Sequence, residues 1–431
     1  MASPSSSHGG KSCPHQSTPF GEPLSAESKS LVDQVRAKLS EPLPSNFDHD
    51  FNLYRFILDA ERRLHRDHVV DAAAKAVHFH LQFRRVMKLD TEKVKSLEEN
   101  PLFVMQLMPQ GQILKDRYDR FGRLLWFADY SSLDLENMAH IEKMSAIVRY
   151  QFWQYESMLQ RVVAHERETG RFSSVRLVID VKDFHLNPFS MLFVSSGGMA
   201  YYSHFFHYQN YPELLSPGEV VNISRWIWVP YSLVKPVMPK GFGDRFKLYD
   251  SEFLKILEQE IDLDNIPECF GGKYEGFKTV PTMKWPEENH WKPDDDELVK
   301  DLETIHVHAR RKRHITIDVH DSGSRIVWYF RTDADVIFGV FRGDDLKAAD
   351  DKEPDVKDLE MVYPYVRLRA DIVHEQGEVA CDRPGRYYIV FSNTHSMIRK
   401  RQVDFILHVQ NGPITWRIRA DGSMTPAVHT I

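Results

Sequence analysis

Cysteine is scarce in this chain of 431 residues. The three thiols, Cys13, Cys269 and Cys381, are too few and too far apart for a disulfide framework or for a zinc site of characteristic spacing. Such sparse cysteine is typical of proteins that work in a reducing compartment. We therefore expect a cytoplasmic protein.

Long hydrophobic runs are also absent. No apolar stretch reaches the roughly 18 residues that a membrane-spanning helix needs. The first residues are rich in Ser, Pro and His and include no apolar core, so no signal peptide is expected. The chain begins Met-Ala and ends His-Thr-Ile, and neither end matches a myristoylation or prenylation signal. Any membrane contact is therefore expected to be peripheral and transient.

Charge of one sign is not in large excess. The chain has 55 Lys and Arg residues against 62 Asp and Glu residues, which gives a net charge of -7. Binding to nucleic-acid phosphates depends on a basic surface. No nucleic acid is therefore expected as a partner.

Catalytic and metal-binding motifs are missing as well. Asp180, His185 and Ser190 lie close together after an expected strand, but no Gly-x-Ser-x-Gly nucleophile elbow accompanies them. Closely spaced pairs of histidines each lack a third metal ligand at a characteristic spacing. We expect no enzymatic activity, no metal site and no cofactor.

The first half of the chain has the pattern of an α/β domain. Residues 1–24 are rich in Ser and Pro and are expected to be disordered. Helical periodicity then predicts three helices, and Asp67 is expected to cap the third. Further on, buried strands alternate with helices, which indicates a mostly parallel sheet with helices packed on it. The expected helices are Ser25 to Leu39, Phe47 to Ala60, Asp67 to Met87, Asn137 to Arg167, Phe189 to Gln209 and Ser251 to Ile261, and the expected strands are Gly122 to Ala128, Val175 to Asp180, Val220 to Ile223 and Phe246 to Leu248.

The second half has the pattern of an all-β domain. A linker with three prolines and five acidic residues runs from Thr279 to Asp296. Beyond it, Ile315, Ile317 and Val319 alternate with polar residues, as in a half-buried strand. Several such short strands separated by turns predict a β-sandwich. The expected strands are Ile305 to Ala309, Ile315 to His320, Arg325 to Arg331, Val336 to Phe341, Val366 to Ile372, Tyr387 to Ser392 and Val403 to Val409.

One segment is unusually apolar for a chain without a membrane span. Nearly every residue from Trp226 to Met238 is large and apolar, so a helix here is either buried or in contact with something apolar that is not protein. One interpretation is a buried crossover helix of the sheet. The other is a hinged gate over an apolar cavity, stiffened by Pro236 and followed by flexible glycines. The gate residues are Trp226, Ile227, Trp228, Tyr231, Leu233, Val234, Val237 and Met238.

The order of short motifs resembles that of a known family. The first half contains Tyr211-Pro212-Glu213, then Leu233-Val234-Lys235-Pro236, then Ile266-Pro267-Glu268-Cys269-Phe270-Gly271-Gly272. In this order these motifs resemble the CRAL-TRIO lipid-binding domain. The second half contains Trp328-Tyr329-Phe330, Ile337-Phe338-Gly339-Val340-Phe341, Pro384-Gly385-Arg386-Tyr387 and Phe391-Ser392-Asn393-Thr394-His395-Ser396. These motifs resemble a GOLD domain, and the two domains in this order are similar to the family of supernatant protein factor and its animal relatives.

This resemblance implies a carrier that holds one hydrophobic molecule and exchanges it at membranes. Phospholipids such as phosphatidylinositol, tocopherol-like lipids and isoprenoids are all open as ligands. In family members that bind phosphatidylinositol, a matching Glu and a basic residue after the gate contact the head group, and here these are Glu213 and Arg245. Two departures weaken the case for phosphoinositide. Asp59 stands where an arginine is usual, unless the register has shifted, and Leu214 replaces a basic residue.

Two further sets of residues are candidates for contact with a ligand or a membrane. Apolar positions on the expected strands and on the helix before Tyr211 offer a pocket wall, although such residues are more often core. Two basic clusters beside strands of the sandwich either meet anionic lipid head groups or keep an exposed edge solvated. The pocket candidates are Phe193, Tyr201, Phe205, Tyr208, Trp126, Ile179 and Ile223, and the basic docking patch comprises Arg310, Arg311, Lys312, Arg313, Arg399, Lys400 and Arg401.

We therefore expect a non-enzymatic lipid carrier that consists of an α/β CRAL-TRIO domain and an all-β GOLD sandwich. The sandwich is expected to dock to a protein partner or to the membrane surface. The rival hypothesis is a signalling or membrane-trafficking adaptor whose lipid pocket is only a sensor. The expected boundaries are 1–24 for the N-terminus, 25–100 for the helical part, 101–278 for the lipid-binding domain, 279–299 for the linker, 300–411 for the sandwich and 412–431 for a C-terminal tail.

Overall fold

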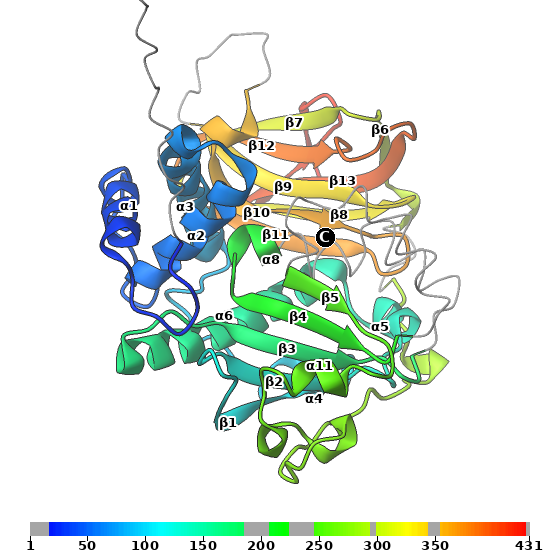
Figure 1. Ribbon diagram of the computed structural model, residues 1–431. Helices are drawn as coiled ribbons and strands as arrows, with labels where there is room; N and C mark the ends of the chain where they lie inside the picture. Colours follow the sequence, from blue (N-terminus) through cyan, green and yellow to red (C-terminus); the bar gives the residue numbers. More distant parts are fainter. Residues whose placement is uncertain (1–16, 185–206, 224–244, 294–298, 344–353, 428–431) are drawn as a thin grey trace, which may run out of the picture.

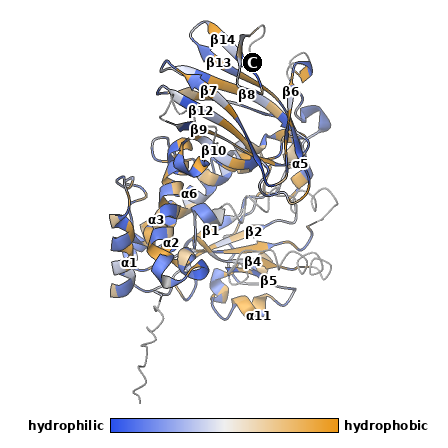
Figure 2. Cartoon of the chain, turned by 90° about the horizontal axis from the view of Figure 1, so that it is seen from above, coloured by the Kyte–Doolittle hydropathy of each residue, from blue (hydrophilic) through white to orange (hydrophobic). Residues whose placement is uncertain are grey.

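The computed structural model describes residues 17–184, 207–223, 245–293, 299–343 and 354–427. Figure 1 shows a group of helices, a five-stranded sheet with its flanking helices, and a C-terminal pair of β-sheets. In Figures 1 and 2, the five-stranded sheet and the C-terminal sheets lie on opposite sides of helix α6 (Met144–Thr169). The predicted order of an α/β part followed by an all-β part is confirmed.

Three helices begin the fold, as predicted. They are α1 (Ala26–Ala37), α2 (Asp50–Arg63) and α3 (Val69–Val86). Ser25 caps α1, because its hydroxyl accepts a hydrogen bond from the Ser28 amide at 3.1 Å. Asp67 does not cap α3. It lies in a 3₁₀ turn, Arg66–His68, that precedes the helix and moves the cap position to His68.

Residues 17–24, which we expected to be disordered, pack against this helical group. The Thr18 amide donates to the Tyr54 hydroxyl at 2.6 Å. The Phe20 ring stacks on Phe172 with 4.7 Å between the ring centroids. The expectation was wrong for these residues because composition alone does not reveal the two contacts, through Thr18 and Phe20, that hold the segment on the helical group.

A five-stranded sheet forms the centre of the α/β part (Figure 1). Its order is β1-β2-β3-β4-β5, with parallel pairs from β2 to β5 and an antiparallel β1 at one edge. The strands are β1 (Gln112–Tyr118), β2 (Leu124–Asp129), β3 (Val175–Asp180), β4 (Leu215–Val221) and β5 (Phe246–Leu248). We did not predict β1, because an edge strand with several polar residues has little apolar alternation. Strand β4 begins before the predicted Val220, because Ser216, Pro217 and Gly218 resemble a turn in sequence.

The two faces of this sheet pack against different partners. Trp126 and Ile179 share one face and belong to the large apolar cluster that includes α2, α3 and α6. Phe127 and Val178 lie on the other face, in a second cluster with helix α11 (Leu254–Leu257). Figure 2 shows α6 and α11 on opposite sides of the sheet. The alternation in the sequence could not tell which strand residues face α6 and which face α11.

Two helices differ from the prediction. The helix expected from Asn137 to Arg167 is divided into α5 (Leu135–Ile141) and α6, because Glu142 has an extended backbone with φ -131 and ψ 141. The helix expected from Ser251 to Ile261 is regular only over α11. Two further short helices are α4 (Pro101–Val104) and α8 (His207–Asn210).

The C-terminal part is a sandwich of two antiparallel sheets. One has the order β10-β9-β12-β7, the other has the order β11-β8-β13-β14-β15, and β6 also pairs with β13. Aromatic contacts join the two sheets. The ring centroids of Phe330 and Phe338 lie 4.8 Å apart, and those of Phe391 and Phe405 lie 6.3 Å apart. The strands are β6 (Glu303–Val307), β7 (Lys312–Val319), β8 (Ser324–Thr332), β9 (Val336–Gly343), β10 (Glu360–Leu368), β11 (Glu375–Cys381), β12 (Gly385–Ser392), β13 (Arg401–Asn411), β14 (Ile414–Ile418) and β15 (Met424–Pro426).

Three of these strands, β11, β14 and β15, were not predicted. Strand β14 begins after a tight turn in which Asn411 pairs with Ile414 and Gly412 has a φ of +55. The two loop residues are Gly412 and Pro413, and a Gly at the first loop position between apolar segments is a hairpin signal that we did not use. The sandwich therefore extends to Pro426, past the boundary of 411 that we expected.

The linker and the sandwich are held to the α/β part by specific contacts. The Trp285 indole donates to the Met105 carbonyl at 3.1 Å, and the Trp285 amide donates to Asn137 Oδ1 at 3.0 Å. The Trp291 ring lies 4.7 Å from the His374 ring of the sandwich. The described part of the linker is therefore packed along the α/β part rather than extended into solvent.

A buried carboxylate of the sandwich caps the first turn of α6. Glu375 is 1% exposed, and its Oε1 accepts a hydrogen bond from the Ser145 amide at 2.8 Å. Beside it, the Lys143 ammonium donates to the Gln376 carbonyl at 2.8 Å. A helix N-terminus favours negative charge. Burial nevertheless dominates and raises the pKa of Glu375 to about 7.

This raised pKa predicts a pH-dependent stability. Between about pH 4.5 and about pH 7 the folded protein binds a proton at Glu375 that the unfolded chain has released. The free energy of unfolding should therefore fall by about 3 kcal/mol, from this group alone, as the pH rises through that window. Glu375→Gln should remove most of this contribution when urea unfolding is compared at about pH 5 and about pH 8. Glu378→Gln, an exposed position on the same strand, is the control, and an equal pH slope in both variants would contradict the assignment.

Candidate functional site

The end of α2, the loop before β4 and the residue before β5 bring five charged side chains together. Asp59, Arg62 and Arg63 lie in the last turns of α2, Glu213 precedes β4, and Arg245 immediately precedes β5. We call these five residues the charged cluster. Segments far apart in sequence therefore meet at the amino-terminal ends of two neighbouring parallel strands.

Glu213 is the centre of the charged cluster. It is 1% exposed, and Arg62 contacts both of its carboxylate oxygens, with 3.0 Å between Nη2 and Oε2. Arg245 donates from Nη1 to Glu213 Oε1, also at 3.0 Å. A bidentate pair between Arg and a carboxylate is among the strongest and most directional ion pairs. Since an unpaired buried carboxylate is strongly destabilising, these two guanidiniums keep Glu213 in its buried position.

The backbone at Glu213 is unusual. Its φ of +58 lies in the left-handed region, which a Glu residue seldom adopts. The turn is fixed on one side by Tyr211, whose hydroxyl donates to the buried Glu156 at 3.1 Å, and on the other side by Leu214, which is fully buried. Sparsely populated backbone conformations persist where surrounding contacts hold them, and they concentrate at functional sites.

Asp59 and Arg63 form the outer part of the charged cluster. Arg63 donates to Asp59 Oδ2 at 2.6 Å, and Arg245 Nη2 lies 3.8 Å from Asp59 Oδ1. Three guanidiniums therefore face two carboxylates. The Arg62 side chain is 31% exposed, so the cluster reaches solvent at this point. An excess of positive charge with a partly exposed guanidinium suits the binding of an anionic group such as a phosphate.

The sequence predicted part of this cluster. Glu213 and Arg245, our head-group candidates, are in direct contact, and neither is a solvated surface charge, because Arg245 is only 6% exposed. We missed Arg62, although Asp59, Arg62 and Arg63 are spaced three and four apart and so share one helix face. Asp59 does stand where an arginine was expected, but Arg62 supplies a guanidinium from the same helix.

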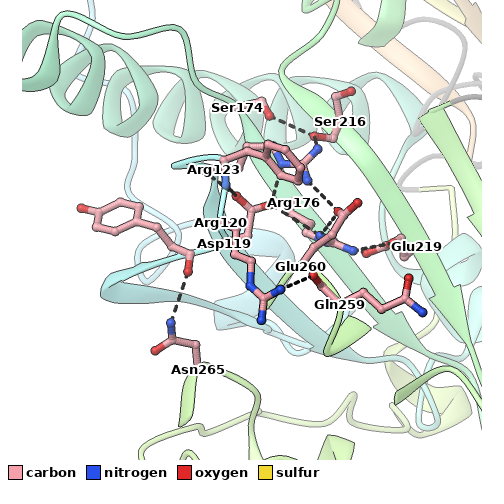
Figure 3. Close-up of polar contacts among 12 residues, drawn as sticks. Asp119, Arg120, Arg123, Ser174, Arg176, Ser216, Glu219, Gln259, Glu260 and Asn265 are labelled. Atoms are coloured by element: carbon pink, nitrogen blue, oxygen red, sulfur yellow. Dashed lines mark hydrogen bonds and ion pairs between the residues drawn. The ribbon is translucent and has the colours of Figure 1, made fainter. Parts of the chain in front are cut away.

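A second network of buried charges ties the strands of the same sheet together (Figure 3). Arg176 of β3 contacts both carboxylate oxygens of Glu219 on β4, at 2.7 and 2.9 Å, and it contacts Glu260 at 2.5 Å. Asp119 joins the network through Arg123, at 2.6 Å. The side chains of Arg176 and Glu219 are at most 2% exposed. This network therefore stabilises the sheet and leaves no open position for a ligand at that pair.

The predicted pocket is described only in part. Trp126, Ile179 and Ile223 are buried, and Trp126 and Ile179 lie on the face of the sheet opposite α11. The remaining candidates all lie outside the described residues. They are Phe193, Tyr201, Phe205, the side chain of Tyr208 and the gate from Trp226 to Met238. The pocket and its gate therefore stay predictions.

The two basic clusters converge, which the predicted docking patch would require. Val307 pairs with Arg401 and Lys312 pairs with Ser392, so the β6–β7 turn and the β12–β13 loop lie side by side. Arg401 is engaged, because its guanidinium donates to Asp335 at 2.9 Å. The exposed members of the basic docking patch are Arg310, Arg311, Arg313, Arg399 and Lys400, and the partly buried ones are Lys312 and Arg401.

The described residues contain no group of three His, Cys, Asp or Glu side chains placed to hold a metal ion. Within the same residues, no helix combines the length and hydrophobicity needed to cross a membrane. Asp180, considered above as a catalytic candidate, accepts hydrogen bonds from the Asn222 amide group at 2.9 Å and from the Lys182 backbone at 2.8 Å. These contacts give Asp180 a structural part in the turn after β3.

Comparison with known proteins identifies two regions of the chain. Residues 24–92 match a domain of unknown function, DUF8435, and residues 109–272 match the CRAL/TRIO domain. The charged cluster spans both regions, because Arg62 belongs to the first and Glu213 and Arg245 belong to the second.

Three relatives cover different shares of the chain. The CRAL-TRIO domain-containing protein F28H7.8 of Caenorhabditis elegans is 21% identical over 372 residues, which are 85% of this chain and 87% of that protein. Protein ctg-1 of the same organism is 22% identical over 351 residues, or 79% of this chain and 88% of that protein. SEC14 cytosolic factor of Kluyveromyces lactis is 23% identical over 212 residues, or 46% of this chain and 66% of that protein.

Among solved structures, the crystal structure of Sfh5 aligns with 62% of this chain and 92% of its own chain, at 14% identity and a TM-score of 0.38. The match over residues 109–272 contains the whole five-stranded sheet and all three motifs that carry the resemblance in the first half of the chain. Residues 109–272 of this chain are therefore a CRAL/TRIO domain.

Proposed function

We propose that this protein is a non-enzymatic carrier that holds one hydrophobic lipid in its CRAL/TRIO domain and exchanges it at membranes. The proposal rests above all on the charged cluster at the amino-terminal ends of β4 and β5. It places a partly exposed, net positive group at one end of a sheet whose adjoining face is apolar.

This arrangement fits an elongated amphipathic ligand. The head group would lie near Arg62, and the chains would run along the strands toward Ile179 and Ile223. Strand β4 runs from Leu215 to Val221, a length of roughly 20 Å at about 3.3 Å per residue. Apolar contact along this length contributes about 25 cal/mol for each Å² removed from water, which is ample for tight binding.

A phospholipid is the ligand class that uses the whole site. A phosphate accepts hydrogen bonds from guanidinium groups, and the Glu213 carboxylate accepts hydrogen bonds from head-group hydroxyls. A tocopherol-like lipid or an isoprenoid would fill the apolar part and leave the charged cluster paired with itself. Because Arg62 supplies a guanidinium from α2, the acidic Asp59 is a weaker objection to a phosphoinositide.

The C-terminal sandwich supplies the docking function in this proposal. We assign it to the GOLD class, on its antiparallel architecture and on the motifs around Trp328 and Phe391, and we infer that it contacts a membrane or a protein partner. The carrier would work in the cytoplasm and associate with membranes only transiently. The alternative is a trafficking adaptor in which the lipid acts as a signal and is not cargo.

Extraction of the purified protein tests the proposal. We expect one lipid per chain in an organic extract of the native protein, identified by mass spectrometry. A preparation that contains no lipid, even after incubation with mixed-lipid vesicles and re-isolation by gel filtration, would refute the carrier. Lipid that is bound but never released to acceptor vesicles would favour the adaptor.

A further inference from the structure

The β12–β13 loop presents two large apolar side chains to solvent. Met397 is 68% exposed and Ile398 is 89% exposed, the two highest values for large hydrophobic residues in the described part of the chain. They are adjacent in sequence and lie at the tip of the loop between Ser392 and Arg401. Single exposed apolar residues are common, but an adjacent pair with nearly full exposure at a loop tip needs an explanation.

The base of this loop is well fixed. The Asn393 side chain is fully buried and donates to two carbonyls, that of Val307 at 3.0 Å and that of Arg399 at 2.9 Å. Ser396 donates from its hydroxyl to the same Arg399 carbonyl at 2.9 Å. These bonds hold both sides of the loop to the end of β6. The tip is therefore presented by an ordered base and is not the result of a frayed segment.

Cationic side chains surround the apolar tip. Arg399 and Lys400 follow the tip in sequence. The Arg310 backbone amide donates to the Asn393 carbonyl at 2.9 Å, so the β6–β7 turn lies beside the β12–β13 loop. The Arg310 guanidinium also contacts the Met397 sulfur at 3.2 Å. Arg310, Arg311, Arg313, Arg399 and Lys400 form no ion pair with a carboxylate in the described part of the chain, whereas Lys312 and Arg401 do.

We propose that this loop is a membrane anchor that inserts Met397 and Ile398 into the interface of an anionic bilayer while the basic docking patch contacts lipid head groups. The inference extends the proposed transfer function by naming the surface through which the carrier meets its membranes. Apolar side chains flanked by Lys and Arg are the combination that binds a protein to the surface of a bilayer without spanning it. A protein partner would more often be met by a wider apolar patch with charges excluded from its centre.

Charge and apolar contact should each contribute measurably to vesicle binding. A basic residue near an anionic surface is worth about fivefold in affinity, so removal of two should weaken binding by about 25-fold at low salt. The contribution should fall as salt rises, because the Debye length shortens to about 8 Å at physiological ionic strength. Removal of both apolar side chains should weaken binding by at least about tenfold at any salt concentration.

Vesicle flotation with the full chain tests this anchor. The vesicles contain either phosphatidylcholine alone or phosphatidylcholine with about one third phosphatidylserine. We expect the unmodified protein to bind the anionic vesicles, M397S/I398S to lose at least about tenfold, and R399Q/K400Q to lose about 25-fold. Ile414→Ser is the matched control, because Ile414 is 54% exposed and lies at the opposite end of β13. That control should bind as the unmodified protein does.

Two results would overturn the anchor: equal vesicle binding by M397S/I398S and the unmodified protein, or equal binding to neutral and anionic vesicles. The lipid content of each variant separates this inference from the carrier function. If the protein contains no bound lipid but M397S/I398S still binds vesicles less well than the unmodified protein, only the carrier function is refuted. If the protein contains bound lipid but M397S/I398S binds vesicles as well as the unmodified protein does, only the anchor is refuted.

Discussion

Replacing Arg84 by methionine is expected to destabilise the folded protein by about 3–5 kcal/mol, because the change leaves a buried carboxylate without its partner. Arg84 contacts both oxygens of Glu156, at 2.8 and 2.9 Å, and neither side chain has any exposed surface. The Tyr211 hydroxyl donates to the same Glu156 carboxylate at 3.1 Å. The pair therefore connects α3 and α6 to the turn that holds Glu213. Urea unfolding, followed by the fluorescence of the native tryptophans, measures the loss.

Neighbouring Arg85 provides the control. Its guanidinium is half exposed and pairs with Glu41, which is also half exposed, so Arg85→Met should change the free energy of unfolding by less than about 1 kcal/mol. The double variant R84M/E156L should recover only part of the lost stability. Apolar residues often replace a buried ion pair without loss, but here the Tyr211 hydroxyl loses its acceptor and Asp90 loses its ion pair with Arg84. Equal stability of R84M and R85M would contradict the role that we assign to this pair.

Arg245→Ala is expected to lower the transfer of an anionic phospholipid between vesicles by about 10- to 100-fold. Arg245 is almost fully buried and donates to Glu213, and a hydrogen bond to a charged group is worth about 1.5–3 kcal/mol. Transfer of an uncharged lipid such as tocopherol should change far less, because it would not use the charged cluster. A fluorescent lipid that is dequenched on leaving donor vesicles provides the measurement for both ligands.

Two variants refine this experiment. Arg245→Lys keeps the charge but loses the planar fork of the guanidinium, so its transfer rate should lie between those of Arg245→Ala and the unmodified protein. Arg85→Ala is the control, because Arg85 is half exposed, lies outside the charged cluster and pairs with Glu41. Equal loss for anionic and uncharged lipids in Arg245→Ala, with normal transfer by Arg85→Ala, would mean that Arg245 supports the fold and not the head group.

Much of the fold could be predicted because its elements are periodic in sequence. Strand β3 has the predicted bounds, Val175 to Asp180, since a short run of buried residues bounded by turns has few alternative structures. Strand β1 and the break at Glu142 escaped prediction because both depend on tertiary partners. Glu142 takes an extended backbone where α6 receives its N-terminal cap from Glu375, which lies more than two hundred positions away in the sequence.

The candidate site was predicted only where a motif marked it. Glu213 and Arg245 followed from the resemblance to the CRAL-TRIO family, whereas Arg62 depended on knowing how α2 packs against the loop before β4. The basic clusters were found by composition, but their convergence is set by the pairing of β6 with β13 and of β7 with β12. Exposure of Met397 and Ile398 could not be predicted, because the sequence alone does not separate a loop tip from a buried strand end.

Native mass spectrometry of the full chain tests the central claim most directly. The account predicts a single species whose mass exceeds that of the polypeptide by one lipid, and loss of that excess when the protein is denatured. Incubation with vesicles of a different lipid should exchange the bound molecule one for one. A native mass equal to that of the bare polypeptide, before and after incubation with mixed-lipid vesicles, would contradict the account.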